Sequence, residues 1–151
     1  MRRERLSDPR WLREGEKIIA AFAENDLGYV LVATTHEFWN YNFQSINLYI
    51  PEKFNMGTIE WHRHTGYITS HGRLTDANFG MEYCIEKGLI NRRTMDTMTI
   101  ASNKIYRLLN EIGEEYDIPK ARELCHQHNL KREQELKERD GVIKKIQSKI
   151  R

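Results

Sequence analysis

The spacing of apolar and polar residues divides the chain into an N-terminal part of mixed character and a helical C-terminal part. Near the start, Ser7 or Asp8 can cap a helix that has Pro9 in its first turn. Gly28 is placed to end this helix. The pattern therefore predicts an N-terminal helix with the apolar residues Trp11, Leu12, Ile18, Ile19 and Phe22.

Strand patterns follow this predicted helix. Residues 29–34 form an apolar, β-branched run that is typical of a strand. In residues 36–50 apolar and polar positions alternate, but the parity changes midway, which predicts a bulge or turn between two strand segments. Residues 58–71 have the pattern of a β-hairpin, with Thr65 and Gly66 as its two-residue turn.

The rest of the chain has helical spacing. One helix is predicted to begin at Thr75 or Asp76 and to end at Gly88, where glycine permits a left-handed exit. A second is predicted over residues 92–115, because its apolar residues recur every three or four positions. The residues of this stripe that we expect to be buried are Ile105, Leu108 and Ile112.

A third helix is predicted to begin at Pro119. The dipeptide at residues 140–141, Asp-Gly, is expected to interrupt it. Beyond the interruption the apolar residues again share one side of a helix. This final stripe consists of Val142, Ile143, Ile146 and Ile150.

Part of this third helix resembles the helix-turn-helix units of transposases. The resemblance lies in residues 121–139, which run from a Glu-Leu-Cys segment into a basic segment. It implies DNA binding by the second helix of such a unit. However, residues 129–131 contain no glycine for a turn, and Glu133 and Glu135 would repel phosphates. One continuous charged helix is therefore the structure that we predict for this segment.

These elements predict an α+β fold. The expected layout is an N-terminal helix, a small antiparallel sheet of three or four strands within about residues 28–71, and C-terminal helices. Residues 1–117 are predicted to form the α+β body. Residues 118–151 are predicted to form a charged helical extension, which either belongs to the same domain or serves as a partner-binding tail.

The charge is unevenly distributed. Residues 24–91 carry four basic and eight acidic side chains, a net charge of −4, whereas residues 118–151 carry ten basic and five acidic ones, a net charge of +5. A basic segment beside an acidic body suits an anionic partner such as nucleic acid or an acidic protein surface. The alternative interpretation is a solvated helix face.

The first residues are charged and lack the apolar segment of a secretory signal, and no run approaches the roughly 18 apolar residues that cross a bilayer. Two cysteines, Cys84 and Cys125, without a Cys-x-x-Cys motif indicate a reducing compartment. We therefore predict a cytoplasmic protein that does not associate with membranes.

The predicted hairpin gives the chain its candidate metal site. A turn at Thr65 and Gly66 would place three histidines and one glutamate on one face. Imidazoles two residues apart on a strand can bind a divalent metal, and a carboxylate can complete the site or act with them in acid–base chemistry. The alternative is a solvated polar face without a cofactor. The candidate ligands are Glu60, His62, His64 and His71.

Candidate binding residues come from two other segments. The C-terminal helices supply paired basic residues, and the stretch after residue 36 supplies aromatic side chains that can stack on bases or grip a partner. The alternative role for the aromatic residues is in the core. The candidates are Lys131, Arg132, Lys144, Lys145, Trp39 and Tyr41.

The sequence contains no phosphate-binding glycine motif, nucleophile elbow or His-Glu-x-x-His motif. The leading hypothesis is therefore a small non-catalytic binding or regulatory protein with a macromolecular partner, nucleic acid or nucleoprotein being favoured. The first alternative is a metal-assisted hydrolase or nuclease that uses the hairpin histidines. The second is a structural subunit, for example a homo-oligomer joined through its C-terminal helices.

Overall fold

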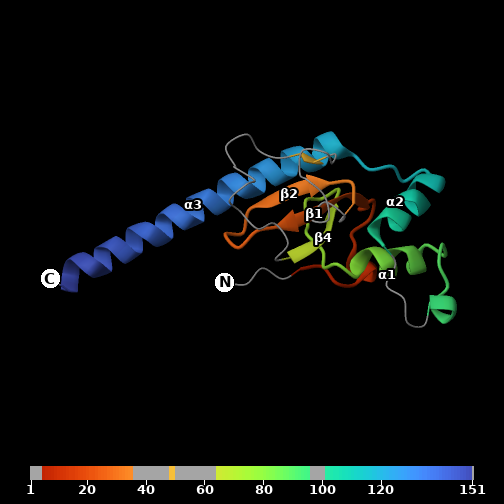
Figure 1. Cartoon of the computed structure of the whole chain (residues 1–151), viewed down its shortest axis with the longest axis horizontal. Coiled ribbons are helices and arrows are strands. Elements are labelled where there is room, and N and C mark those ends of the chain that lie inside the picture. The colour runs from red at the N-terminus through yellow and green to blue at the C-terminus, as the bar shows by residue number, and fades with distance from the viewer. Residues whose placement is uncertain (1–4, 36–47, 50–63, 96–100, 151) are drawn as a thin grey trace.

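A four-stranded antiparallel sheet with the strand order β3-β2-β1-β4 organises the protein (Figure 1). The computed structural model describes residues 5–35, 48–49, 64–95 and 101–150. The strands are β1 (Ile18–Glu24), β2 (Val30–Ala33), β3 (Leu48–Tyr49) and β4 (His64–Thr69). The α-helices in the described residues are α1 (Phe79–Glu86), α2 (Ser102–Glu111) and α3 (Ile118–Ile150). The predicted α+β class is therefore confirmed.

The predicted N-terminal helix is wrong. The helix signals at Asp8 and Pro9 produce only a short 3-10 turn, η1 (Pro9–Trp11), in which the Asp8 carboxylate accepts a hydrogen bond from the Arg10 amide. The apolar run that follows forms the central strand β1, whose first six residues are all buried. A strand covered on both faces has no polar face, so its apolar residues do not alternate. A continuous apolar run of this kind fits a buried strand and a helix equally well.

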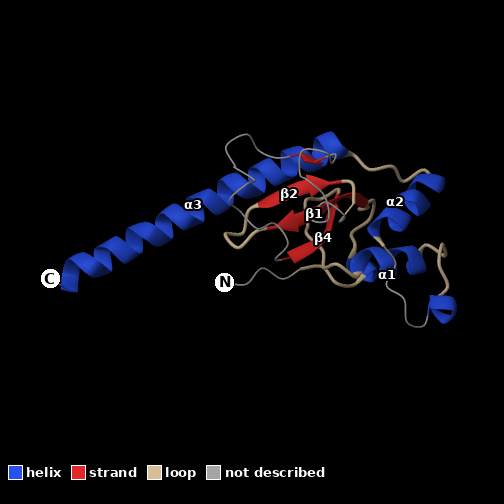
Figure 2. Ribbon diagram, viewed as in Figure 1, coloured by secondary structure: helices blue, strands red, loops and turns tan. Residues whose placement is uncertain are grey.

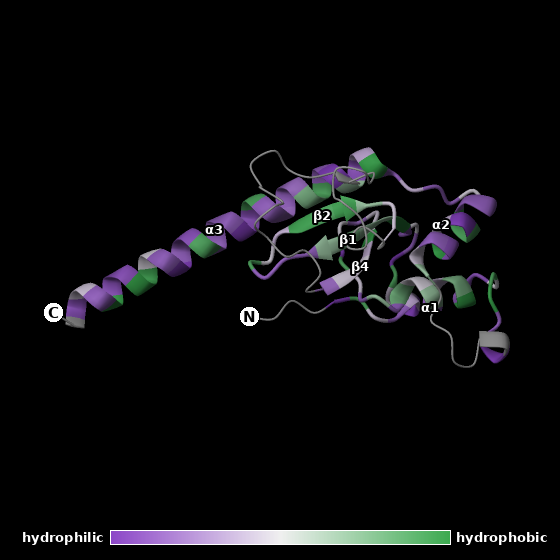
Figure 3. Cartoon of the chain, viewed as in Figure 1, coloured by the Kyte–Doolittle hydropathy of each residue, from purple (hydrophilic) through white to green (hydrophobic). Residues whose placement is uncertain are grey.

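Helices cover the sheet on both faces, with α1 and α2 on one side and α3 on the other (Figure 2). Apolar side chains from the sheet pack into each layer, and β2 in particular is drawn in the green of hydrophobic residues (Figure 3). The core on the α1–α2 side includes Ile18, Tyr67, Phe79, Tyr83, Ile105 and Leu109. The core on the α3 side includes Ile19, Phe22, Val32, Ile68, Ala121 and Cys125.

The predicted turn at Thr65 and Gly66 is also wrong, because both residues lie within strand β4 and pair with β1. The chain reverses later, around Gly72, which has a φ of +81°. Gly66 is required by close packing, since a Cβ there would lie 2.0 Å from the Thr75 carbonyl oxygen. The predicted strand over residues 29–34 is confirmed as β2.

The predicted helix that ends at Gly88 is confirmed as α1, and Gly88 has a φ of +74°. The helix predicted over residues 92–115 is shorter in the structure. Its described parts are a 3-10 turn, η5 (Arg92–Met95), and α2. Within α2, Ile105 is buried as predicted, Leu108 is partly buried, and Leu109 is fully buried. Ile112 lies beyond the end of α2 and is 43% exposed, so its predicted burial is wrong.

The last helix, α3, is longer than predicted and runs without a break through residues 140–141. A single glycine inside a helix costs only about 1 kcal/mol relative to alanine, which the neighbouring residues tolerate. At 1.5 Å per residue the 33 residues of α3 span about 50 Å. Its C-terminal part extends well beyond the sheet (Figure 1). No helix in the described residues combines the length and apolar character needed to cross a membrane.

Candidate functional site

The first half of α3, residues 118–132, is anchored to the body. On its inner side Ala121, Cys125 and Asn129 are buried against the sheet. The Asn129 side chain amide donates to the Val30 carbonyl oxygen and accepts from the Val30 amide, both at 2.8 Å. This side chain thus satisfies two backbone groups of β2 that would otherwise be buried without partners.

Two further α3 side chains hold the turn between β1 and β2. The His128 ring nitrogen Nε2 lies 3.1 Å from the Gly28 carbonyl oxygen, and Arg132 Nε donates to the Leu27 carbonyl oxygen at 2.7 Å. Arg132 also forms an ion pair with Glu135 at 3.1 Å. These contacts, together with those of Asn129, set the position and direction of α3 on the sheet.

The second half of α3, residues 133–150, forms a projecting arm. Every residue from 137 to 149 is exposed. Its apolar side chains Val142, Ile143 and Ile146 are 57%, 41% and 54% exposed. Val142 and Ile143 are adjacent, and Ile146 lies four and three positions after them, so the three side chains share one side of the helix. The arm therefore presents an uncovered apolar stripe, which is visible as short green bands in Figure 3.

The charges of the arm are segregated along its length. Residues 133–140 contain four acidic and two basic side chains, whereas residues 141–151 contain four basic and no acidic ones. Lys144, Lys145 and Lys149 are exposed. Within the part of the chain that the structure describes, no carboxylate lies in ion-pair distance of these three lysines. The end of the arm therefore carries three exposed cationic groups.

Three of the predicted binding residues are exposed on α3, namely Lys131, Lys144 and Lys145. The side chain of a fourth, Arg132, donates to the Leu27 carbonyl oxygen and forms an ion pair with Glu135. The aromatic candidates Trp39 and Tyr41 lie outside the described residues. Sequence reasoning missed the contact between Asn129 and Val30, because no local pattern links two residues 99 positions apart.

The turn at Thr65 and Gly66 that would group the predicted metal ligands does not form, because both residues lie within β4. Glu60 and His62 lie outside the described residues, His64 begins β4, and His71 lies in the turn after β4. His64 and His71 are thus at opposite ends of one strand. Among the described residues, no three His, Cys, Asp or Glu side chains are close enough to hold a metal ion.

A buried ion pair does involve this turn. The Glu16 carboxylate, whose side chain is fully buried, accepts hydrogen bonds from Arg73 at 2.6 and 2.9 Å and from the Thr69 hydroxyl at 2.5 Å. His71 Nδ1 lies 3.9 Å from the same carboxylate. Burial by itself would raise the pKa of Glu16, but the hydrogen bonds from Arg73 and Thr69 outweigh it and lower the pKa to about 2. The pair ties the loop before β1 to the turn after β4.

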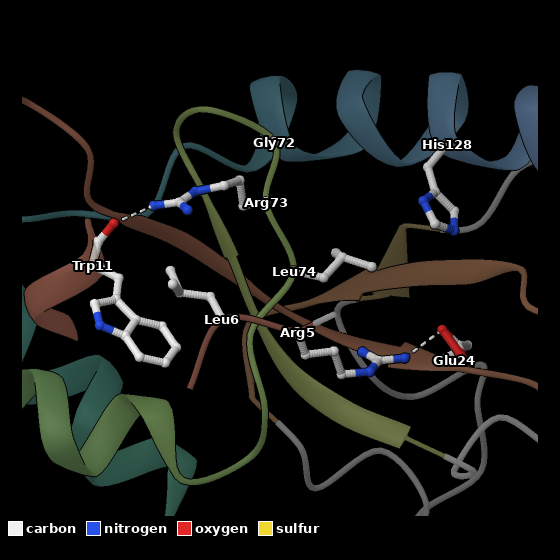
Figure 4. Close-up of a pocket in the computed structure, with 8 residues that line it drawn as sticks. All are labelled: Arg5, Leu6, Trp11, Glu24, Gly72, Arg73, Leu74 and His128. Atoms are coloured by element: carbon white, nitrogen blue, oxygen red, sulfur yellow. Dashed lines mark hydrogen bonds and ion pairs between the residues drawn. The ribbon is translucent and has the colours of Figure 1, made fainter. Parts of the chain in front are cut away.

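A cleft of about 440 Å³ lies between this turn and the N-terminal segment, with His128 pointing toward it from α3 (Figure 4). Its two arginines are already paired, Arg5 with Glu24 at 2.5 Å and Arg73 with Glu16 at 2.6 Å. Each of these two arginines is thus already neutralised by a carboxylate. The lining residues are Arg5, Leu6, Trp11, Glu24, Gly72, Arg73, Leu74 and His128.

The most distinctive candidate surface is therefore the arm rather than the cleft. Its cationic end and its apolar stripe both face solvent on a helix that the body holds in one direction. Comparisons with protein-family models, with curated proteins and with solved structures found no match for this chain.

Proposed function

We propose that the protein is a non-catalytic binding protein that contacts nucleic acid through the basic end of its C-terminal arm. The observation that supports this proposal is the segregation of charge on α3. Residues 141–151 carry four basic and no acidic side chains, and Lys144 and Lys145 are exposed. A cluster of this kind releases counterions when it meets a phosphate backbone, and this release drives binding that is independent of base sequence.

The anchoring of α3 adds to this support. A fully flexible basic tail loses conformational entropy when it binds, and the clamp at Asn129 and Arg132 lowers this loss because it fixes where the arm begins and in which direction it leaves the body. On a helix Lys145 and Lys149 are one turn apart and can follow one phosphate strand. The acidic side chains of residues 133–140 would be repelled by phosphate, so contact is expected at the tip rather than along the whole arm.

The test is a charge reversal, Lys144→Glu with Lys145→Glu, measured by fluorescence anisotropy of a labelled DNA duplex over a salt series. If both lysines contact phosphates, log Kd of the wild type depends on log salt with a slope that the reversal reduces by about 2. The matched control is Lys104→Glu with Arg107→Glu, which makes the same change in net charge at exposed positions on α2. We expect the control to retain most of the affinity.

Two results would overturn the proposal. One is a wild-type protein that binds neither duplex nor single-stranded nucleic acid at low salt. The other is binding to an acidic peptide such as polyglutamate with no binding to nucleic acid, which would assign the arm to an acidic protein surface. The metal-assisted hydrolase is not proposed, because the turn that would group its histidines is replaced by strand β4 at Thr65 and Gly66.

A further inference from the structure

The inner side of α3 continues unchanged into the arm. Along the helix, the residues on this side are spaced alternately by four and three positions, which is the heptad spacing of a coiled coil. On this side Cys125 and Asn129 are buried against the sheet, Arg132 and Leu136 are half-buried, and residues 137–149 are exposed. In the arm this side continues through Leu136, Arg139, Ile143 and Ile146.

An arm of 18 residues with an exposed apolar stripe is marginally stable as an isolated helix in water, because most helical stability in proteins comes from packing of the apolar side. Val142, Ile143 and Ile146 lack such packing in the described residues. A partner that covers them would both bury apolar surface and stabilise the helix.

The charge pattern identifies a partner. The half of the arm nearer the body has a net charge of −2, from four acidic and two basic residues, and residues 141–151 have a net charge of +4. Two arms that lie antiparallel therefore place the acidic half of each against the basic half of the other. A parallel pair would place like charges together and would be disfavoured.

We propose that two copies of this chain pair through their arms as a short antiparallel coiled coil. In the register that the heptad spacing favours, Ile146 of one copy packs on Leu136 of the other, and Ile143 packs on Arg139. Glu135 then lies opposite Lys149 of the other copy. Arg139 is the one charged residue on the seam of the arm, where its aliphatic stem packs while its guanidinium reaches solvent.

This pairing goes beyond the proposed function and does not depend on it. Lys144 and Lys145 occupy the positions directly after Ile143, so they face away from the seam. A pair of copies therefore leaves these lysines accessible and presents one basic cluster at each end of the coil.

The first experiment measures the mass of the full-length chain by light scattering across the micromolar range. We expect the mass to rise with concentration toward 36.0 kDa, twice the 18.0 kDa of one chain. Ile143→Asp with Ile146→Asp should weaken the dimer at least tenfold without unfolding the body, since both side chains are exposed in the single chain. Arg139→Leu should strengthen it at least tenfold, because leucine completes the apolar seam.

A second experiment tests the orientation by oxidative cross-linking. In the antiparallel pair, residue 146 lies opposite residue 136 and about 15 Å along the coil from the same residue of the other copy. Leu136→Cys with Ile146→Cys should therefore form an intermolecular disulfide, while Ile146→Cys alone should not. The native Cys84 and Cys125 are buried and serve as an internal negative control.

Three outcomes would overturn the inference. The first is a wild-type mass that stays at one chain throughout the concentration series. The second is efficient cross-linking of the single Ile146→Cys variant, which indicates parallel arms. The third is a lower thermal midpoint at constant mass after truncation at Asp140, which means that the arm packs on its own chain. Loss of nucleic acid binding alone would leave the pairing intact and would overturn only the proposed function.

Discussion

The anchored half of α3 and its projecting arm share one uninterrupted helical backbone but differ in what surrounds it. In residues 118–132 the inner side is buried, and three side chains bind the backbone of β2 and of the turn before it. In residues 137–149 every side chain is exposed, including three large apolar ones. The comparison shows that amphipathic spacing marks a side that can be buried, whereas the rest of the fold decides whether it is buried within the chain.

The greatest loss of stability is expected when the anchored half of α3 loses its side-chain hydrogen bonds to β2. Asn129→Ala removes both hydrogen bonds to Val30 and leaves a buried amide and carbonyl without partners. At about 1–3 kcal/mol for each of the two unsatisfied groups, we expect the free energy of unfolding to fall by about 2–6 kcal/mol in urea denaturation. Gln134→Ala, at an exposed position of the same helix, is the control and should change it by less than about 0.5 kcal/mol. A small loss for Asn129→Ala would show that the helix is held by apolar contacts alone.

The next largest loss of stability is expected at the buried ion pair of the body, which we compare with an exposed ion pair of the arm. Because the pKa of Glu16 is lowered from 4.5 to about 2 in the folded state, its stabilisation is present above about pH 4.5 and is lost as the pH falls toward 2. The contribution is about 3 kcal/mol at neutral pH. Glu16→Gln should therefore unfold more easily than wild type at pH 7 but not at pH 2, as measured by urea denaturation at each pH.

The matched variant in the arm is Glu133→Gln, because Glu133 lies 3.9 Å from Lys137 in a pair whose lysine is 71% exposed. Exposed pairs contribute little, so we expect a change below about 0.5 kcal/mol at either pH. If the two variants lost equal stability, the contrast between body and arm would not extend to electrostatics.

The smallest effect is expected within the arm, at Gly141. Gly141→Ala adds a methyl group that meets no other atom within 4 Å, so it changes only helix propensity. We expect the arm to gain about 1 kcal/mol of local helix stability. Amide hydrogen exchange near residue 141 should slow by roughly fivefold, while the thermal midpoint of the body stays unchanged. A raised midpoint would indicate that the arm and the body unfold together.

Some parts of the structure follow from local sequence. The β-branched run of β2 and the exit at Gly88 were predicted correctly, because each depends on backbone preferences of a few adjacent residues. The continuous helix over residues 121–139 was also predicted, since the chain there has no turn residue. The charge segregation of the arm can be read from the sequence alone, and both the proposed nucleic acid binding and the proposed pairing of arms depend on it.

Other parts depend on neighbours distant in sequence. The same apolar run that suits a helix becomes strand β1 because layers of helices cover both of its faces. Gly66 resembles a turn residue, yet it lies in a strand because the Thr75 backbone passes too close for a side chain. The grouping of the candidate metal ligands on one face depended on a turn at Thr65 and Gly66, whereas both residues lie within β4 and pair with β1.

Neighbouring residues alone set the strand preference of β2, the helix exit at Gly88 and the distribution of charge along α3. Contacts with the rest of the fold clamp α3 to β2 through Asn129 and leave its apolar stripe exposed from residue 137 onward. The physical reason is that burial and hydrogen-bond satisfaction are set by contacts across the fold. The Asn129–Val30 pair spans 99 positions of sequence, and no local pattern encodes such a contact.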